Sequence, residues 1–167
     1  GNSRQLLGEH SLRWLHGGVC ASPAPLGHLA HMPTFAPQIA YYLERYREGD
    51  ADGAFHGLLE LDHEVLPELA AEFRAATDTR LRVFLLGVIW QHRHQSVIPL
   101  LAEALLDSEP QVWREALDGL VTLSSPASLE ALRAARTRHF TKHRAAEEFR
   151  RWLEEAIEQA ETEAQRV

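Results

Sequence analysis

This chain repeats itself, and the repeat limits its fold more than any other property of the sequence. Residues 77–107 align with residues 108–138 at an offset of 31. The apolar positions of the two copies coincide: Leu81 with Val112, Leu85 with Ala116, Leu86 with Leu117, Ile89 with Leu120, Ile98 with Leu129, and Leu101 with Leu132. Residues 65–70 recur as residues 97–102 at an offset of 32, which indicates an earlier copy. A repeat of this length predicts a stack of similar units.

Each copy holds two apolar stretches whose spacing of three and four residues is that of an amphipathic helix. In the first copy these stretches cover residues 81–89 and 97–105. Serine and proline occur together where helices are expected to begin: Ser96 before Pro99, Ser108 before Pro110, and Ser125 before Pro126. Two short helices cannot bury their apolar faces alone, so the units are expected to stack.

The start of each copy carries a family resemblance. Asp78 through Val83, and Asp107 followed by Val-Trp-Arg-Glu-Ala-Leu at residues 112–117, resemble the Asp…Val-Arg…Ala-Leu pattern of HEAT repeats. The closest resemblance is to bacterial short-unit HEAT-like repeat proteins, which are armadillo-type α-solenoids. It covers residues 62–138 well and residues 37–61 more weakly. The resemblance implies an all-α fold, a short right-handed α-solenoid of about three and a half HEAT-like helical hairpins.

The two ends of the chain differ from the repeats. We expect three parts: an irregular N-terminal helix and Pro/Gly-rich loop (1–36), the HEAT-like repeats (37–138), and a C-terminal capping helix (139–167). In the first part Gln5–Leu15 is predicted to be helical, and in the second the helices at 37–47 and 53–61 come before the clear repeats.

The C-terminal helix is predicted from about Thr141 to Ala164, with one apolar and one charged side. Its apolar stripe consists of Phe149, Trp152, Leu153, Ala156, Ile157 and Ala160. A terminal cap needs this division, because one side covers the last repeat and the other faces water. We therefore expect Trp152→Ala to cost more stability than any surface substitution.

Charge and composition exclude several classes of function. The formal net charge of -7 argues against nucleic-acid binding, which needs a basic surface. No apolar run reaches the roughly 18 residues of a membrane span, and no secretory leader is recognisable. Cys20 is the only cysteine, which excludes an internal disulfide and a multi-thiolate zinc site. We expect a cytoplasmic protein without nucleic-acid or membrane partners.

Glu64, Glu68 and Glu72, here called the acidic ridge, follow each other in steps of four along a predicted helix. No Lys or Arg occurs in residues 53–73. Like charges at this spacing cost a few tenths of a kcal/mol per pair, so the ridge does not serve helix stability. A partner protein with a basic surface would be steered to it. The alternative is a solvated face, and further along the chain Arg133 and Arg136 make the corresponding helix basic.

Two further features are candidate partner contacts. The turn Trp90-Gln91-His92-Arg93-His94 joins two predicted helices. Two imidazoles are too few for a metal site, so Trp90, His92, Arg93 and His94 are interpreted as a partner-contact loop or a solvated turn. Trp113 aligns with Arg82 in a column expected to be exposed, where it would be an interface anchor, or else it packs on a neighbouring unit.

The sequence also contains residues of the types that bind metal. His16, Cys20, His28 and His31 suit zinc by type, but their spacing is not a recognised one. The pair His63-Glu64 resembles the iron-binding pairs of the HEAT-like deoxyhypusine hydroxylases, but the next copy has Gln95-Ser96, so that activity is set aside.

From these features we predict a non-enzymatic protein-binding module without metal or cofactor, of the kind that includes inhibitors and toxin-neutralising immunity proteins. The alternative is a metal-dependent or lyase-type enzyme that uses the His-rich N-terminal loop.

Overall fold

The computed structural model describes residues 34–165, and the predicted helix Gln5–Leu15 lies outside them. The elements are α1 (Ala36–Arg47), α2 (Ala51–Leu59), η1 (His63–Val65), α3 (Leu66–Ala75), α4 (Thr79–Gln91), η2 (Gln95–Val97), α5 (Ile98–Ala104), α6 (Pro110–Leu123), α7 (Pro126–Ala134), η3 (Ala135–Thr137) and α8 (His143–Ala164), where η marks a 3-10 helix. The predicted all-α fold is confirmed. The bounds expected for α1, α2 and α8 are correct to within two residues.

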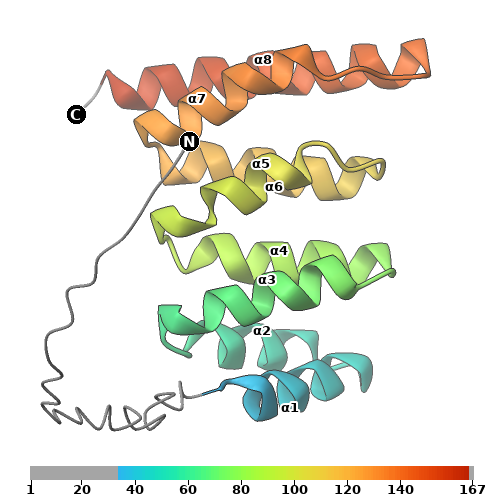
Figure 1. Cartoon of the computed structure of the whole chain (residues 1–167), viewed down its shortest axis with the longest axis vertical. Coiled ribbons are helices and arrows are strands. Elements are labelled where there is room, and N and C mark those ends of the chain that lie inside the picture. Colours follow the sequence, from blue (N-terminus) through green and yellow to red (C-terminus); the bar gives the residue numbers. More distant parts are fainter. Residues whose placement is uncertain (1–33, 166–167) are drawn as a thin grey trace, which may run out of the picture. The chain divides into compact units, whose positions relative to one another are not determined.

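The helices form two layers, which is the arrangement of a solenoid. Helices α1, α3, α5 and α7 lie in one layer, and α2, α4, α6 and α8 lie behind them (Figure 1). In the second layer α2 contacts α4, α4 contacts α6, and α6 contacts α8. The layers are joined where α1 packs on α2, α3 on α4, α5 on α6, and α7 on α8. Each hairpin therefore covers the next one.

The aligned positions of the repeat form the core. Ten of the twelve are fully buried: Leu85, Leu86, Ile89, Ile98, Leu101, Val112, Ala116, Leu117, Leu120 and Leu132. The other two, Leu81 and Leu129, are partly buried against the same core. Burying a Leu or Ile side chain contributes about 1.5–3 kcal/mol, so the repeated positions supply much of the driving force for stacking.

The helix starts follow the sequence only in part. Asp78 caps α4 by accepting a hydrogen bond from a first-turn amide at 2.8 Å. Ser125 caps α7 as expected. Ser96 and Ser108 do not cap α5 and α6, because the residues at those cap positions are Val97 and Glu109 and neither side chain accepts a hydrogen bond. At both of these starts a proline in the first turn sets the backbone angle instead.

Trp113 is buried, with 2% of its surface exposed, so the expectation of an exposed column was wrong. Its ring meets that of Phe149 on α8 edge to face, with the centroids 5.2 Å apart. The alignment of the two copies could not show this, because it ends at residue 138 and does not include α8. The other interpretation, in which Trp113 packs on a neighbouring element, is the correct one.

Trp152 lies at the edge of the apolar stripe of α8 and is 37% exposed, whereas Phe149 and Leu153 are buried. The Arg114 guanidinium lies over its ring at 5.0 Å. Trp152 thus belongs to the predicted stripe but is buried only in part. The stripe indicated the buried side of the helix, but not how far the neighbouring helices extend over each margin.

Candidate protein-binding surfaces

The acidic ridge is divided in the structure. Glu64 lies in η1, and Glu68 and Glu72 lie on α3. Glu64 and Glu72 are exposed, and within residues 34–165 no Lys or Arg forms an ion pair with either. Glu68 is half-buried and accepts hydrogen bonds from the backbone amide of Phe35 at 2.9 Å and the hydroxyl of Thr34 at 3.1 Å. Among the described residues, the ridge therefore offers two carboxylates without an ion-pair partner, not three.

Glu68 caps α1 from a different helix. Phe35 is the N-cap residue of α1, and its own side chain accepts no capping hydrogen bond. A carboxylate beside the first turn of a helix satisfies a free amide and interacts favourably with the helix dipole. The sequence analysis missed this role, because Glu68 and Phe35 are 33 residues apart and no local pattern links them.

The structure joins the start of the ridge to the Trp90–His94 turn. The rings of His63 and His94 are stacked, with centroids 4.7 Å apart and an interplanar angle of 13°. Asp62 lies 2.9 Å from His63, and the His94 ring contacts the Ser96 hydroxyl at 2.7 Å. Two features treated as separate in the sequence thus form one edge, here called the histidine edge and defined by His63, His92 and His94.

Only part of the predicted contact loop is available to a partner. Trp90 is half-buried, and its Nε1 donates a hydrogen bond of 2.7 Å to Glu115 on α6. His92 is half-buried, and its Nε2 has no partner within the described residues. Arg93 and His94 are exposed, and Arg93 takes the left-handed conformation at φ 54° that ends the α4 turn. Arg93 and His94 remain candidate contacts, whereas Trp90 joins two helices.

Burial changes the titration of two groups near this turn. It lowers the pKa of His92 and His63 lowers it further, while the Leu58 backbone and the charge of Asp62 partly offset the shift. Burial raises the pKa of Glu115, and the hydrogen bond from Trp90 partly offsets this. Both groups are held toward their neutral forms, which is the usual response to desolvation.

The described residues provide no metal site. Within residues 34–165 no group of three or more His, Cys, Asp or Glu side chains could hold an ion. His63 and Glu64 follow each other in η1, and His63 stacks on His94. The loop residues His16, Cys20, His28 and His31 lie outside the described residues.

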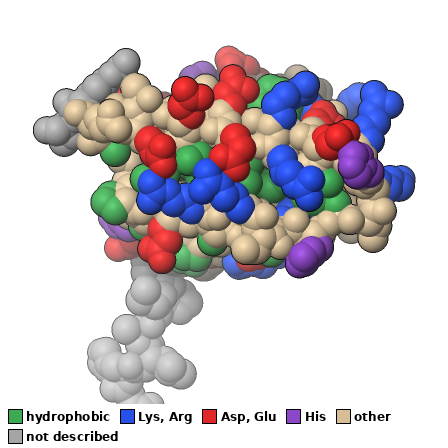
Figure 2. Space-filling view, turned by 90° about the horizontal axis from the view of Figure 1, so that it is seen from above, with side chains coloured by type: hydrophobic (Ala, Val, Ile, Leu, Met, Phe, Trp, Pro, Cys, Tyr) green, Lys and Arg blue, Asp and Glu red, His purple; other side chains and the backbone are tan. Residues whose placement is uncertain are grey.

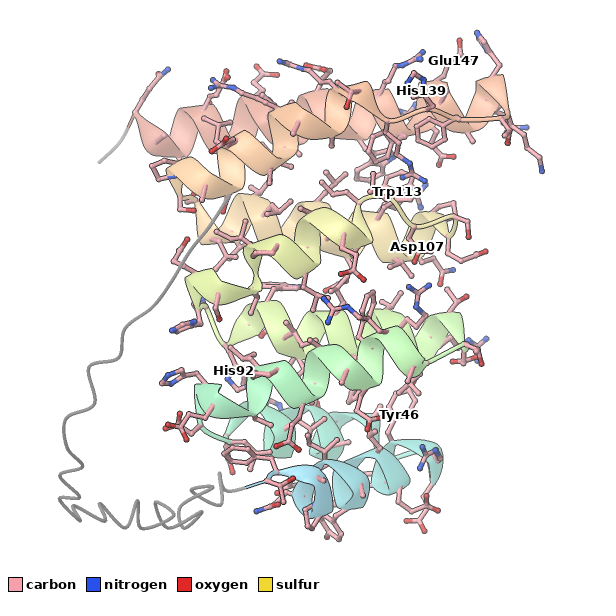
Figure 3. The ribbon with its side chains drawn as sticks, in the orientation of Figure 1. Tyr46, His92, Asp107, Trp113, His139 and Glu147 are labelled. Carbon is pink, nitrogen blue, oxygen red and sulfur yellow. The ribbon has the colours of Figure 1, made fainter. Side chains whose placement is uncertain are left out.

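A cavity of about 620 Å³ lies between the start of α6 and the connection from α7 to α8. Its lining includes Trp113, Phe140, Arg138, Lys142 and the exposed Leu106. Figure 3 shows Trp113, Asp107 and His139 near this end of the hairpins, whereas His92 lies at the opposite end. The sequence analysis did not identify this site, although residues 133–144 contain five Lys or Arg and no acidic residue.

The fold and its exposed charged faces define an α-solenoid of stacked helical hairpins with surfaces suited to contact. The family model for HEAT repeats matches residues 66–158, which is more than half of the chain. The chain therefore belongs to the HEAT-repeat family. No curated protein and no solved structure gives a significant match.

HEAT repeats generally mediate interactions between proteins and are generally non-catalytic scaffolds. Within the described part of the chain, every helix is too short or too polar to cross a membrane.

Proposed function

We propose that this chain is a non-enzymatic protein-binding module that holds a partner with a basic surface. The contact surface consists of Glu64 and Glu72, with Arg93 and His94 of the adjoining turn at its margin. The observation that carries the proposal is the pair of exposed carboxylates on η1 and α3 that no Lys or Arg of residues 34–165 neutralises. Such a surface attracts a cationic partner and accelerates its association.

The neighbouring helix supports this choice of surface. Arg74, the basic residue that follows Glu72 on α3, is bound by Glu103 of α5 through hydrogen bonds of 2.8–3.1 Å. Arg74 therefore does not neutralise the ridge. A partner that supplies positive charge would therefore be attracted to Glu64 and Glu72.

In its finer form the proposal is that the chain acts as a cytoplasmic inhibitor, as toxin-neutralising immunity proteins do. The support is analogy: a small acidic repeat protein suits the covering of a basic enzyme surface. This form predicts that the captured partner is an enzyme whose activity falls when the chain is added in stoichiometric amount.

The test is quantitative affinity capture with two charge-reversed variants. Glu64→Arg/Glu72→Arg changes the contact surface and leaves Glu68 in place, so that the start of α1 is kept. Glu155→Arg/Glu158→Arg makes the same change of charge on exposed positions of α8. We expect the unmodified protein and the α8 variant to capture similar amounts of a basic partner. The ridge variant should capture at least tenfold less of it. Equal capture by all three proteins would contradict the proposal.

A further inference from the structure

The cavity between α6 and the start of α8 combines apolar and cationic walls. Phe140 supplies aromatic surface, whereas Trp113 borders the cavity but is almost fully buried. Leu106, at the rim, is the most exposed large apolar side chain in the described residues, at 63%. A volume of about 620 Å³ is within the range of small ligand sites, roughly 300–1,000 Å³. An exposed leucine beside an open cavity is the arrangement expected where an apolar side chain of a partner is received.

Residues 133–144, here called the basic segment, pass beside this cavity. Arg133 and Arg136 are bound by Glu161 and Glu154 of α8. Arg138, Lys142 and Arg144 have no carboxylate within ion-pair distance among residues 34–165. In Figure 2, which looks onto α7 and α8, histidine side chains and several basic ones lie toward one end of this face beside acidic side chains, and further basic side chains lie across its middle.

Arg138 is held in place by backbone acceptors, and among residues 34–165 no carboxylate forms an ion pair with it. Its two terminal nitrogens donate to the backbone carbonyls of Leu105 and Asp107. The nearest carboxylate, that of Asp107, is engaged by Arg82. The only acidic side chain that lines the cavity, Glu148, is bound by Arg114. The lining of the cavity is therefore net positive, because Arg138 and Lys142 face one acidic side chain that Arg114 already neutralises.

We propose that this cavity binds a short acidic segment of a partner protein, with an apolar side chain against Leu106 and Phe140 and flanking carboxylates beside Lys142, where the positive charge of Arg138 also attracts them. Charge complementarity selects the acidic partner, and the apolar floor selects a peptide over a phosphate group. A nucleic acid is disfavoured because the molecule as a whole carries a charge of -7. The site is separate from the acidic ridge, and its test does not depend on the function proposed there.

Lys142 is the only lysine in the sequence, which gives the experiment a local probe. Reductive methylation of the full-length protein with ¹³C-formaldehyde labels this side chain and the α-amino group alone. The labelled protein is titrated with peptides Glu-Glu-X-Glu-Glu in which X is Ala, Leu, Phe or Trp. Lys-Lys-Phe-Lys-Lys, inorganic phosphate and a short single-stranded RNA serve as comparisons.

We expect the Lys142 resonance to shift with saturation for X as Leu, Phe or Trp, and at least tenfold weaker binding for X as Ala. In a fluorescence assay Lys142→Glu and Leu106→Ser should each weaken binding at least tenfold, whereas Arg80→Glu on the exposed start of α4 should not. A silent resonance with every acidic peptide, or equal binding of phosphate or RNA, overturns the proposal. Unchanged affinity in Lys142→Glu does so as well.

Discussion

At Gly119 the missing side chain lets Trp90 of α4 lie directly against α6. A Cβ atom at this position would stand 2.8 Å from Cγ and 3.0 Å from Cβ of Trp90. These atoms are next to the backbone of α4, so they cannot turn away as the end of a flexible side chain can. The close approach also places Trp90 Nε1 on Glu115, four residues before Gly119.

We expect Gly119→Ala to lower the free energy of unfolding by about 1–3 kcal/mol, because the overlap outweighs the gain of about 1 kcal/mol in helix propensity. Gly87→Ala is the matched control. Its Cβ would stand 3.1 Å from Oε1 of Glu115, the atom that accepts the Trp90 hydrogen bond, and 3.7 Å from Phe55, so a shift of a few tenths of an ångström relieves the contact and Gly87→Ala should cost clearly less than Gly119→Ala. Urea unfolding followed by circular dichroism gives both values, and equal effects would refute this account.

His92 links stability to pH. Its pKa is lowered in the folded chain from an ordinary value near 6.5, so the unfolded chain binds its proton first as the pH falls. The stability it contributes is present above pH 6.5 and is lost as the pH falls toward the lower folded value. The raised pKa of Glu115 acts with the opposite sign, since folding favours its protonated form.

The substitution His92→Gln removes the titrating group and keeps a polar side chain. We expect the loss of unfolding free energy between pH 7 and pH 5 to be smaller in this variant than in the unmodified protein. His56→Gln removes an exposed histidine of α2 and is the comparison that separates the effect of a buried imidazole from that of losing any histidine. Urea unfolding at pH 7 and pH 5 measures the change in unfolding free energy of each protein. An equal change in His92→Gln and in the unmodified protein would contradict the role given to His92.

At the scale of elements, α8 closes the last hairpin. It packs on α6 and α7 and buries most of its apolar side there, with Trp152 at the exposed margin. Phe149 is at the centre of this contact, since its ring meets Trp113 edge to face and lies 5.1 Å from that of Phe140. The Arg138 guanidinium covers Phe149 at 4.7 Å, which ties the α7–α8 connection to the same point.

We expect Phe149→Ala to cost about 3–5 kcal/mol, which is usual for a fully buried Phe. Trp152→Ala should cost only about 1 kcal/mol, because the exposed ring loses one cation–π contact and part of its packing. The sequence placed both residues in the same apolar stripe, and the structure separates them by their burial. Denaturant unfolding of the two variants measures both losses, and a larger loss for Trp152→Ala than for Phe149→Ala would contradict this account.

At the scale of the whole described chain, charge changes along the stack. Two free carboxylates mark η1 and α3, whereas unpaired Lys142 and Arg144 lie at the start of α8. The proposed binding surfaces thus have opposite sign and lie on different hairpins. They are tested by separate substitutions, so failure of one proposal leaves the other unaffected.

The sequence predicted the stacked hairpins well, because each copy buries the same positions, as Leu85 and Ala116 do. The candidate sites were harder to predict. The burial of Trp113 depends on α8, and the capping role of Glu68 depends on α1. Both helices lie outside the clear repeats. The cavity depends on how the basic segment folds back beside Trp113, and a linear pattern of charges does not contain that geometry.

The hydrogen bond from the Phe35 amide to Glu68 means that the start of α1 is capped by a side chain of α3. One hairpin of this solenoid therefore cannot be exchanged for another without loss of this cap. A chimera that replaces α3 by a copy of α5, which has Leu100 where α3 has Glu68, would leave the first turn of α1 without its acceptor. This contact between α1 and α3 thus favours one order of the hairpins, even though their cores are alike.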